Sequence, residues 1–137
     1  MQLLRWSSEI ELGFEQIDNQ HKQLFNMINE LSLACTYGQP NSVMLHLVER
    51  LQEYATTHFK AEEDLFSSYD YPDRVDHEAD HASFFDSINY MRKQCEIIDT
   101  PMAGKIRDFL IDWLWNHIKS KDMKYKKFID KRRLTGL

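Results

Sequence analysis

Five of the six histidines in the sequence are candidate metal ligands, and three of them belong to pairs with helical spacing. His77 and His81 form an i, i+4 pair, so both rings can reach one ion from the same helix face. His58 and Glu62 form a second pair with the same spacing. Imidazole nitrogens and carboxylate oxygens are common ligands of transition metals. The two pairs therefore predict a metal site.

Three further candidate ligands, His21, His117 and Asp122, lie on other segments of the chain. His117 and Asp122 are five residues apart, which corresponds to a rotation of about 140° around a straight α-helix. This pair therefore needs either a long-reaching aspartate or a widened, π-like turn. The sixth histidine, His46, is rotated by about 120° from His58 around the same expected helix. We expect His46 to be an ordinary surface histidine.

The elements that position these residues are marked by three prolines. Pro40, Pro72 and Pro101 each sit beside turn-forming residues, and the long intervals between them lack the alternation of strands. The predicted helices cover residues of about 19–37, 41–68, 74–98 and 102–122. We expect an N-terminal arm over 1–18 and a basic C-terminal extension, partly helical, over 123–137.

The candidate ligands fall on the apolar stripes of these helices. In the second expected helix, Leu47, Leu51 and Tyr54 share one direction with His58 and Glu62. Long amphipathic helices with short connections predict an all-α, up-down-up-down antiparallel four-helix bundle, formed as a single domain over 1–137. In such a bundle the inward-facing imidazoles of all four helices meet in the core.

Each candidate also has a structural interpretation. A single core histidine is more often a hydrogen-bonded structural residue than a ligand. Glu62 could be a solvated helix charge, and Asp122 could be a surface charge among its flanking lysines. The convergence of all seven residues on one core favours the metal site over these separate interpretations.

The number and type of these ligands restrict the metal. Five imidazoles and two carboxylates exceed the four ligands of one zinc ion and do not suit Ca²⁺ or Mg²⁺, which prefer oxygen. Two ions bridged by both carboxylates and a hydroxide use all seven residues, leave one position open and bring the net charge near neutral. Nitrogen-rich ligation with an open position favours iron, while copper and manganese remain alternatives.

An open iron site could bind a small ligand such as O₂. Its candidate pocket is formed by apolar neighbours of the ligands, which could equally serve only core packing: Phe25, Ile28, Phe59, Trp113, Leu114 and Ile118.

Composition excludes several other classes of protein. The chain has 137 residues, 42% of them hydrophobic, which suits one folded domain. Residues 1–120 carry ten Lys/Arg and twenty Asp/Glu, which argues against nucleic acid as a partner, whereas residues 121–137 carry seven and two. No apolar run is long enough to span a membrane and no secretory signal is present, so we expect a cytoplasmic protein. Cys35 and Cys95 are expected to be buried free thiols. We see no extra apolar face and expect a monomer.

The ordered set of candidate ligands resembles that of the bacterial hemerythrins over nearly the whole chain. The matching pattern is His21, His58-x-x-x-Glu62, His77-x-x-x-His81 and His117-x-x-x-x-Asp122. Further similar stretches are Trp6, Ile17-Asp18-x-Gln20-His21-Lys22 and Trp113-Leu114-x-x-His117-Ile118.

The resemblance implies a non-haem di-iron centre that binds O₂ reversibly. It implies that His77, His81 and His117 hold one iron and that His21 and His58 hold the other. Glu62 and Asp122 would bridge the two ions together with a solvent-derived oxo or hydroxo group. O₂ would bind the five-coordinate iron, and azide-like anions or NO could take its place. By the same similarity, Trp113 and Leu114 would line the O₂ pocket.

The expected function is oxygen storage, delivery or buffering, with no catalytic residue. One alternative is a sensor of O₂, NO or redox state that acts through a partner, for which the basic C-terminal extension is the candidate docking surface. Another alternative is a di-iron enzyme, such as an oxidase or a catalyst that handles peroxide or NO. A pocket larger than O₂ requires would favour the enzyme.

Overall fold

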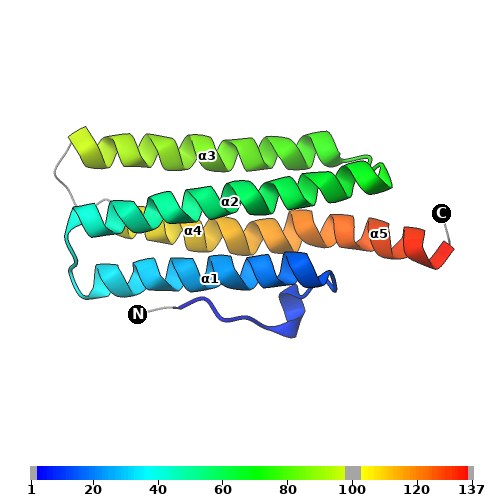
Figure 1. Ribbon diagram of the computed structural model, residues 1–137, viewed down its shortest axis with the longest axis horizontal. Helices are drawn as coiled ribbons and strands as arrows, with labels where there is room; N and C mark the ends of the chain where they lie inside the picture. Colours follow the sequence, from blue (N-terminus) through cyan, green and yellow to red (C-terminus); the bar gives the residue numbers. More distant parts are fainter. Residues whose placement is uncertain (1–2, 98–102, 136–137) are drawn as a thin grey trace.

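Four long helices run alternately in opposite directions (Figure 1). The computed structural model describes residues 3–97 and 103–135. The helices are α1 (Glu15–Thr36), α2 (Asn41–Tyr69), α3 (Arg74–Ile97) and α4 (Ala103–His117). Both α1 and α3 pack against α2 and α4, and the described residues include no strand. The prediction of an all-α four-helix bundle is therefore confirmed.

Backbone geometry explains where α1 and α2 end. Gly38 follows α1 with φ of 63°, a left-handed conformation that glycine adopts without steric cost. Asp70 ends α2 in the same region, with φ of 50°. The backbone amide of Tyr71 then donates to the carbonyl of Phe66 at 2.9 Å, which satisfies one of the last carbonyls of α2. The next residue is Pro72, which cannot continue the helix.

The first helix begins at Glu15, four residues before its predicted start, so the N-terminal arm ends at Phe14 rather than at residue 18. The buried carboxylate of Asp18 accepts hydrogen bonds from the backbone amides of Leu12 at 2.8 Å and Gly13 at 2.9 Å. These bonds hold the arm against the first turn of α1. The predicted boundaries at residues 98 and 102 lie outside the described residues.

The arm runs along α1, and a short 3-10 turn, Ser8–Ile10, interrupts it (Figure 1). The backbone of Leu4 exchanges two hydrogen bonds with the side chain of Asn29, at 2.8 and 2.9 Å. Trp6 packs edge-on against Phe25, with ring centroids 5.6 Å apart. The arm therefore covers one side of α1 near His21.

A π-helical segment, Ile118–Asp122, follows α4 and leads into α5 (Met123–Thr135). Of the two alternatives that the spacing of His117 and Asp122 leaves open, the structure has the widened turn. Figure 1 shows that α5 continues the direction of α4 and extends past the ends of α2 and α3. The predicted C-terminal helical extension is confirmed.

Buried apolar side chains form two clusters. The large cluster includes Leu24, Ile28, Phe59, Leu110 and Leu114, from α1, α2 and α4, together with residues of α3. The small cluster joins the arm and α1 to the end of α2 and to α5, and its members are Leu12, Phe14, Ile17, Phe66, Tyr71, Tyr125 and Ile129. In the part of the chain that the structure describes, no helix has both the length and the apolar character needed to cross a bilayer.

Candidate metal centre

All seven predicted ligands lie in the interior of the bundle, and each residue is at most 3% exposed. Their positions follow from the helical repeat, because residues four apart share one face of a helix. α1 and α3 contribute side chains from their first halves, α2 contributes side chains from its second half, and α4 contributes its last residue. Asp122 is the last residue of the π-helical segment. The structure therefore brings together every residue of the predicted set.

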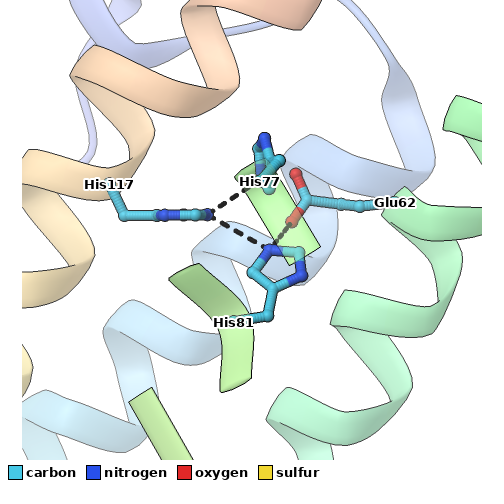
Figure 2. Close-up of side chains that lie close together, drawn as sticks. All are labelled: Glu62, His77, His81 and His117. Atoms are coloured by element: carbon cyan, nitrogen blue, oxygen red, sulfur yellow. Dashed lines mark hydrogen bonds and ion pairs between the residues drawn. The ribbon is translucent and has the colours of Figure 1, made fainter. Parts of the chain in front are cut away.

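One group of four side chains comprises Glu62, His77, His81 and His117. Figure 2 shows these side chains pointing toward one another from α2, α3 and α4. The Nε2 atom of His117 lies 3.1 Å from Nε2 of His77 and 3.2 Å from Nε2 of His81. Oε1 of Glu62 lies 3.3 Å from Nε2 of His81. One ligand atom from each residue lies within 4.8 Å of the others, so the four could hold one metal ion.

A second group shares Glu62 with the first and adds His21, His58 and Asp122. Oε1 of Glu62 lies 3.3 Å from Nε2 of His58, as close as it lies to His81. Oδ2 of Asp122 lies 3.1 Å from Nε2 of His21. This group also satisfies the 4.8 Å limit and could hold a second ion beside the first.

Asp122 faces both sets of imidazoles, as Glu62 does. Its other oxygen, Oδ1, lies 3.1 Å from Nε2 of His77 and 3.2 Å from Nε2 of His117. The π-helical segment makes this approach possible, because it turns Asp122 to the same side of the helix as His117. Both carboxylates thus stand between three imidazoles on one side and two on the other.

The electrostatics of the cluster favour cations. Burial acts to raise the pKa of Glu62 and Asp122, but the surrounding imidazoles outweigh it and hold both pKa values below their usual range. Burial acts to lower the pKa of His117, but the carboxylates of Asp122 and Asp80 outweigh it and raise this pKa to about 10. Burial keeps the pKa of His81 below 6.5. Two anionic carboxylates in a dry core need compensating positive charge.

The polar atoms of the cluster fit bound metal better than a network of hydrogen bonds. None of the four carboxylate oxygens of Glu62 and Asp122 has a hydrogen-bond partner within the described residues. The Nε2 atoms of His21 and His58 lack such a partner too. Buried polar atoms without partners are costly, and metal coordination would satisfy these atoms.

Two neighbours orient the histidines from outside the cluster. Nδ1 of His58 donates to Oε1 of Gln20 at 2.8 Å, and Nδ1 of His117 donates to Oδ2 of Asp80 at 2.5 Å. Each bond leaves the Nε2 atom of that ring directed into the cluster. Sequence reasoning did not assign roles to Gln20 and Asp80. Each directly precedes a candidate ligand, and Gln20 also belongs to a stretch that resembles the hemerythrins, but neither signal indicates a hydrogen bond to a histidine of another helix.

Tyr125 of α5 is a third residue that sequence reasoning missed. Its side chain is fully buried, its ring lies 5.6 Å from that of His77, and its hydroxyl lacks a hydrogen-bond partner among the described residues. Burial, together with Glu62 and Asp122, raises the pKa of Tyr125 well above 10. The phenol is therefore neutral beside the cluster.

Aromatic rings and a small apolar cavity adjoin the cluster. Phe59 stacks on His81 at 3.8 Å between ring centroids, and Trp113 stacks on His117 at 4.3 Å. A cavity of about 10 Å³ lies one layer of side chains away. Its lining includes Ile28, Phe59, Trp113 and Leu114 of the predicted pocket, together with five further apolar residues. Phe25 and Ile118 of the predicted set are buried but do not line this cavity.

The remaining predictions concern residues away from the cluster. His46 is exposed on α2, as predicted. Cys35 is a free thiol, but it is half-buried rather than buried, and burial raises its pKa. The side chain of Cys95 lies outside the described residues.

Comparisons with known proteins agree with this arrangement. The hemerythrin HHE cation binding domain matches residues 12–129. The chain is similar to a bacteriohemerythrin of Clostridium acetobutylicum, with 32% identity over 88% of this chain and 96% of that protein. It is 30% identical to a bacteriohemerythrin of Stenotrophomonas maltophilia, over 91% of this chain and 80% of that protein. It is 33% identical to a hemerythrin-like protein of Naegleria gruberi, over 88% of this chain and 89% of that protein. With a buried His/Glu/Asp site at its centre and this match over most of its length, the chain belongs to the hemerythrin family.

Proposed function

We propose that the cluster holds two iron ions and that the protein binds O₂ reversibly for storage, delivery or buffering. His77, His81 and His117 would hold one ion, and His21 and His58 the other. The observation that carries this proposal is the placement of the carboxylates. Oε1 of Glu62 is equidistant from an imidazole of each set, at 3.3 Å, and the two oxygens of Asp122 face opposite sets.

This division would give the two ions different numbers of protein ligands. With both carboxylates and a solvent-derived oxo or hydroxo bridge, six ligands would be available to one ion and five to the other. A pair of iron ions with one open position supplies reversible binding of O₂, and azide-like anions or NO would compete for the same position. The open position would lie at the ion held by His21 and His58.

The apolar surroundings support a small ligand. The cavity beside the cluster has about 10 Å³, which is at the lower limit for one water molecule. Its lining offers no polar side chain to hold water, so the cavity favours an apolar diatomic molecule. Leu114 and Phe59 keep bulk water away from the site, which protects a bound ligand from protonation and loss. This cavity itself is too small to hold the organic substrate of an oxidase.

The contacts of the basic C-terminal residues favour an O₂ carrier over a sensor. A sensor would need these residues free to dock on a partner. Several of these lysines are engaged within the protein. Lys121 pairs with Asp76 at 2.6 Å, and Lys124 pairs with Asp73 at 3.1 Å. These pairs link the π-helical segment and α5 to the start of α3, which is a structural role.

Iron content and visible spectra test the proposal. Protein purified and reduced without oxygen should hold two irons per chain, gain a visible absorption band in air and lose it under argon. Two irons that oxidise at once and stay oxidised would favour the sensor or enzyme instead. Zinc, or no metal, would contradict the di-iron site.

A further inference from the structure

The five imidazoles of the cluster differ in what their outward nitrogens contact. Nδ1 of His58 donates to a neutral amide oxygen, that of Gln20. Nδ1 of His117 donates to a carboxylate, that of Asp80. The Nδ1 atoms of His21, His77 and His81 have no hydrogen-bond partner among the described residues. His117 is therefore distinguished by an anionic acceptor on its outward nitrogen.

Asp80 reaches His117 from the neighbouring helix. It lies on α3, three residues after His77 and one before His81, and its side chain is 30% exposed. It lines a surface hollow of about 370 Å³ between α3 and α4, together with Trp113 and Asp112. Nδ1 of His117 and Oδ2 of Asp80 are 2.5 Å apart, within hydrogen-bond distance of each other.

The ring of His117 is fixed on two sides. Asp80 holds its edge, while Trp113 stacks on its face at an interplanar angle of 13°. Together they leave Nε2 directed at the cluster, where it lies about equally far from His77 and His81. An acceptor on Nδ1 also raises the electron-donating strength of Nε2 toward a metal.

We propose that Asp80 is a positioning residue that fixes the tautomer and orientation of His117 and makes it the strongest imidazole donor of the site. The inference rests on the proposed di-metal function. Its consequence is an asymmetry between the two positions. The ion held by His77, His81 and His117 is bound more tightly because of Asp80, while the ion held by His21 and His58 gains nothing from it.

The test uses zinc, which needs no oxygen and no electrons, titrated against a competing chelator. Asp80→Ala should weaken one of the two zinc positions by about 10–100-fold and leave the other unchanged. Asp80→Asn keeps an acceptor without the charge and should have a smaller effect, and Asp80→Glu should restore most of the affinity. Asp112→Ala is the matched control, because it removes an exposed carboxylate from the same hollow and should change neither position.

Nuclear magnetic resonance gives a readout that does not depend on affinity. In the zinc-loaded protein, the proton on Nδ1 of His117 should give a strongly downfield signal, which Asp80→Ala should remove and Asp112→Ala should keep. Thermal unfolding of the variants checks that each one folds.

The outcomes separate this inference from the proposed function. Equal effects of Asp80→Ala and Asp112→Ala, or equal weakening of both zinc positions, would overturn the role of Asp80 and leave the di-metal site intact. If the unaltered chain binds fewer than two metal ions, the proposed function fails. In that case the role of Asp80 is tested by the signal of the proton on Nδ1 of His117 in the metal-free protein. Loss of this signal in Asp80→Ala supports the inference. Absence of the signal from the unaltered chain overturns it.

Discussion

Nε2 of His117 lies 3.2 Å from Oδ1 of Asp122, although five residues separate them along one continuous helical stretch. In a regular α-helix the two side chains would point about 140° apart. The π-helical segment Ile118–Asp122 removes this difference. It also keeps Tyr125 and Ile129 of α5 facing inward, since these follow Asp122 by three and seven residues.

Deleting Ser120 should preserve the site. The deletion makes the spacing four residues, which places both side chains within about 40° on a regular α-helix. We expect unchanged iron content, and elemental analysis of the purified variant measures it. Ser120 is exposed, so little packing is lost.

Inserting an alanine after Ser120 is the opposite change. Six residues correspond to a rotation of about 120° from the starting direction, so Asp122 would point away from the cluster. This variant should hold less than one iron per chain. Full iron content after the insertion would show that Asp122 is not needed as a ligand.

Removing a predicted ligand should release metal, while removing the control histidine should not. His77→Ala should lower the iron content from two to one or fewer per chain and lower the melting temperature of the iron-loaded protein, because metal binding is coupled to folding. His46→Ala should match the unaltered chain in both measurements. Loss of iron in His46→Ala would mean that the inward face of α2 is assigned wrongly.

Metal binding should tighten as the pH rises toward 10. The pKa of His117 in the metal-free protein is raised to about 10, so this ring carries a proton at pH 8 that an incoming ion must displace. The pKa of His81 is lowered, so His81 is already neutral and releases none. Calorimetric zinc titrations at pH 8, in buffers of different ionisation enthalpy, should show release of about one proton from His117.

The raised pKa of His117 also affects the stability of the metal-free chain. A rise in pH tightens metal binding but makes the metal-free chain less stable. The stabilisation from protonated His117 is fully present below pH 6.5, the unfolded value, and is lost as the pH rises through about 10. The metal-free protein should therefore unfold at lower denaturant concentration at pH 10 than at pH 7. Zero proton release at pH 8, or equal stability at both pH values, would contradict the assignment.

Leu114→Ala should make the iron-loaded protein oxidise faster in air. Leu114 is 5% exposed and lines the cavity beside the cluster, so truncation opens room for water near the metals. The free energy of unfolding should fall by about 2–5 kcal/mol. Stopped-flow or visible spectroscopy follows the oxidation.

The control for that variant is Leu31→Ala. Leu31 is equally buried in the large cluster but does not line the cavity, so it should destabilise the protein without speeding oxidation. Equal oxidation rates for the two variants would remove Leu114 from a gating role.

Asp18→Ala should loosen the N-terminal arm. The carboxylate of Asp18 accepts hydrogen bonds from Leu12 and Gly13, and their loss should lower the free energy of unfolding by about 1.5–3 kcal/mol. Denaturant unfolding measures the change. Glu15→Ala removes an exposed carboxylate from the same turn and should cost about 0.5 kcal/mol or less. Equal losses for the two variants would show that Asp18 acts only through its charge at the helix start.

The parts of the molecule that could be predicted from the sequence depend on local periodicity. The i, i+4 spacing of His58 with Glu62 and of His77 with His81 fixes which side chains share a helix face, whatever the helix packs against. Proline and glycine fix the ends of helices for equally local reasons. The five-residue gap before Asp122 limits the possibilities to a long-reaching aspartate or a π-like turn, and the structure has the turn.

The parts that could not be predicted depend on contacts between distant segments. The hydrogen bond from His117 to Asp80 spans 37 residues, and the one from His58 to Gln20 spans 38. Each hydrogen bond depends on how one helix is oriented relative to its neighbour, and the periodicity of the sequence does not determine that orientation. The early start of α1 depends on the carboxylate of Asp18, which accepts a hydrogen bond from the backbone of the preceding arm. The sequence pattern around Asp18 does not distinguish this role from that of a solvated charge.

The seven polar side chains lie between the two apolar clusters. Phe59 of the large cluster stacks on His81. The ring centroid of Phe66, in the small cluster, lies 4.6 Å from that of His77. Without metal, we expect this layer to be the least stable part of the interior, because the carboxylate oxygens of Glu62 and Asp122 have no hydrogen-bond partner among the described residues. Hydrogen exchange in the metal-free chain should therefore proceed as two cooperative units, with the arm, the end of α2 and α5 opening before the rest. Binding of two ions would merge these units into one, so the order in which the backbone amides exchange should depend on whether the protein holds metal.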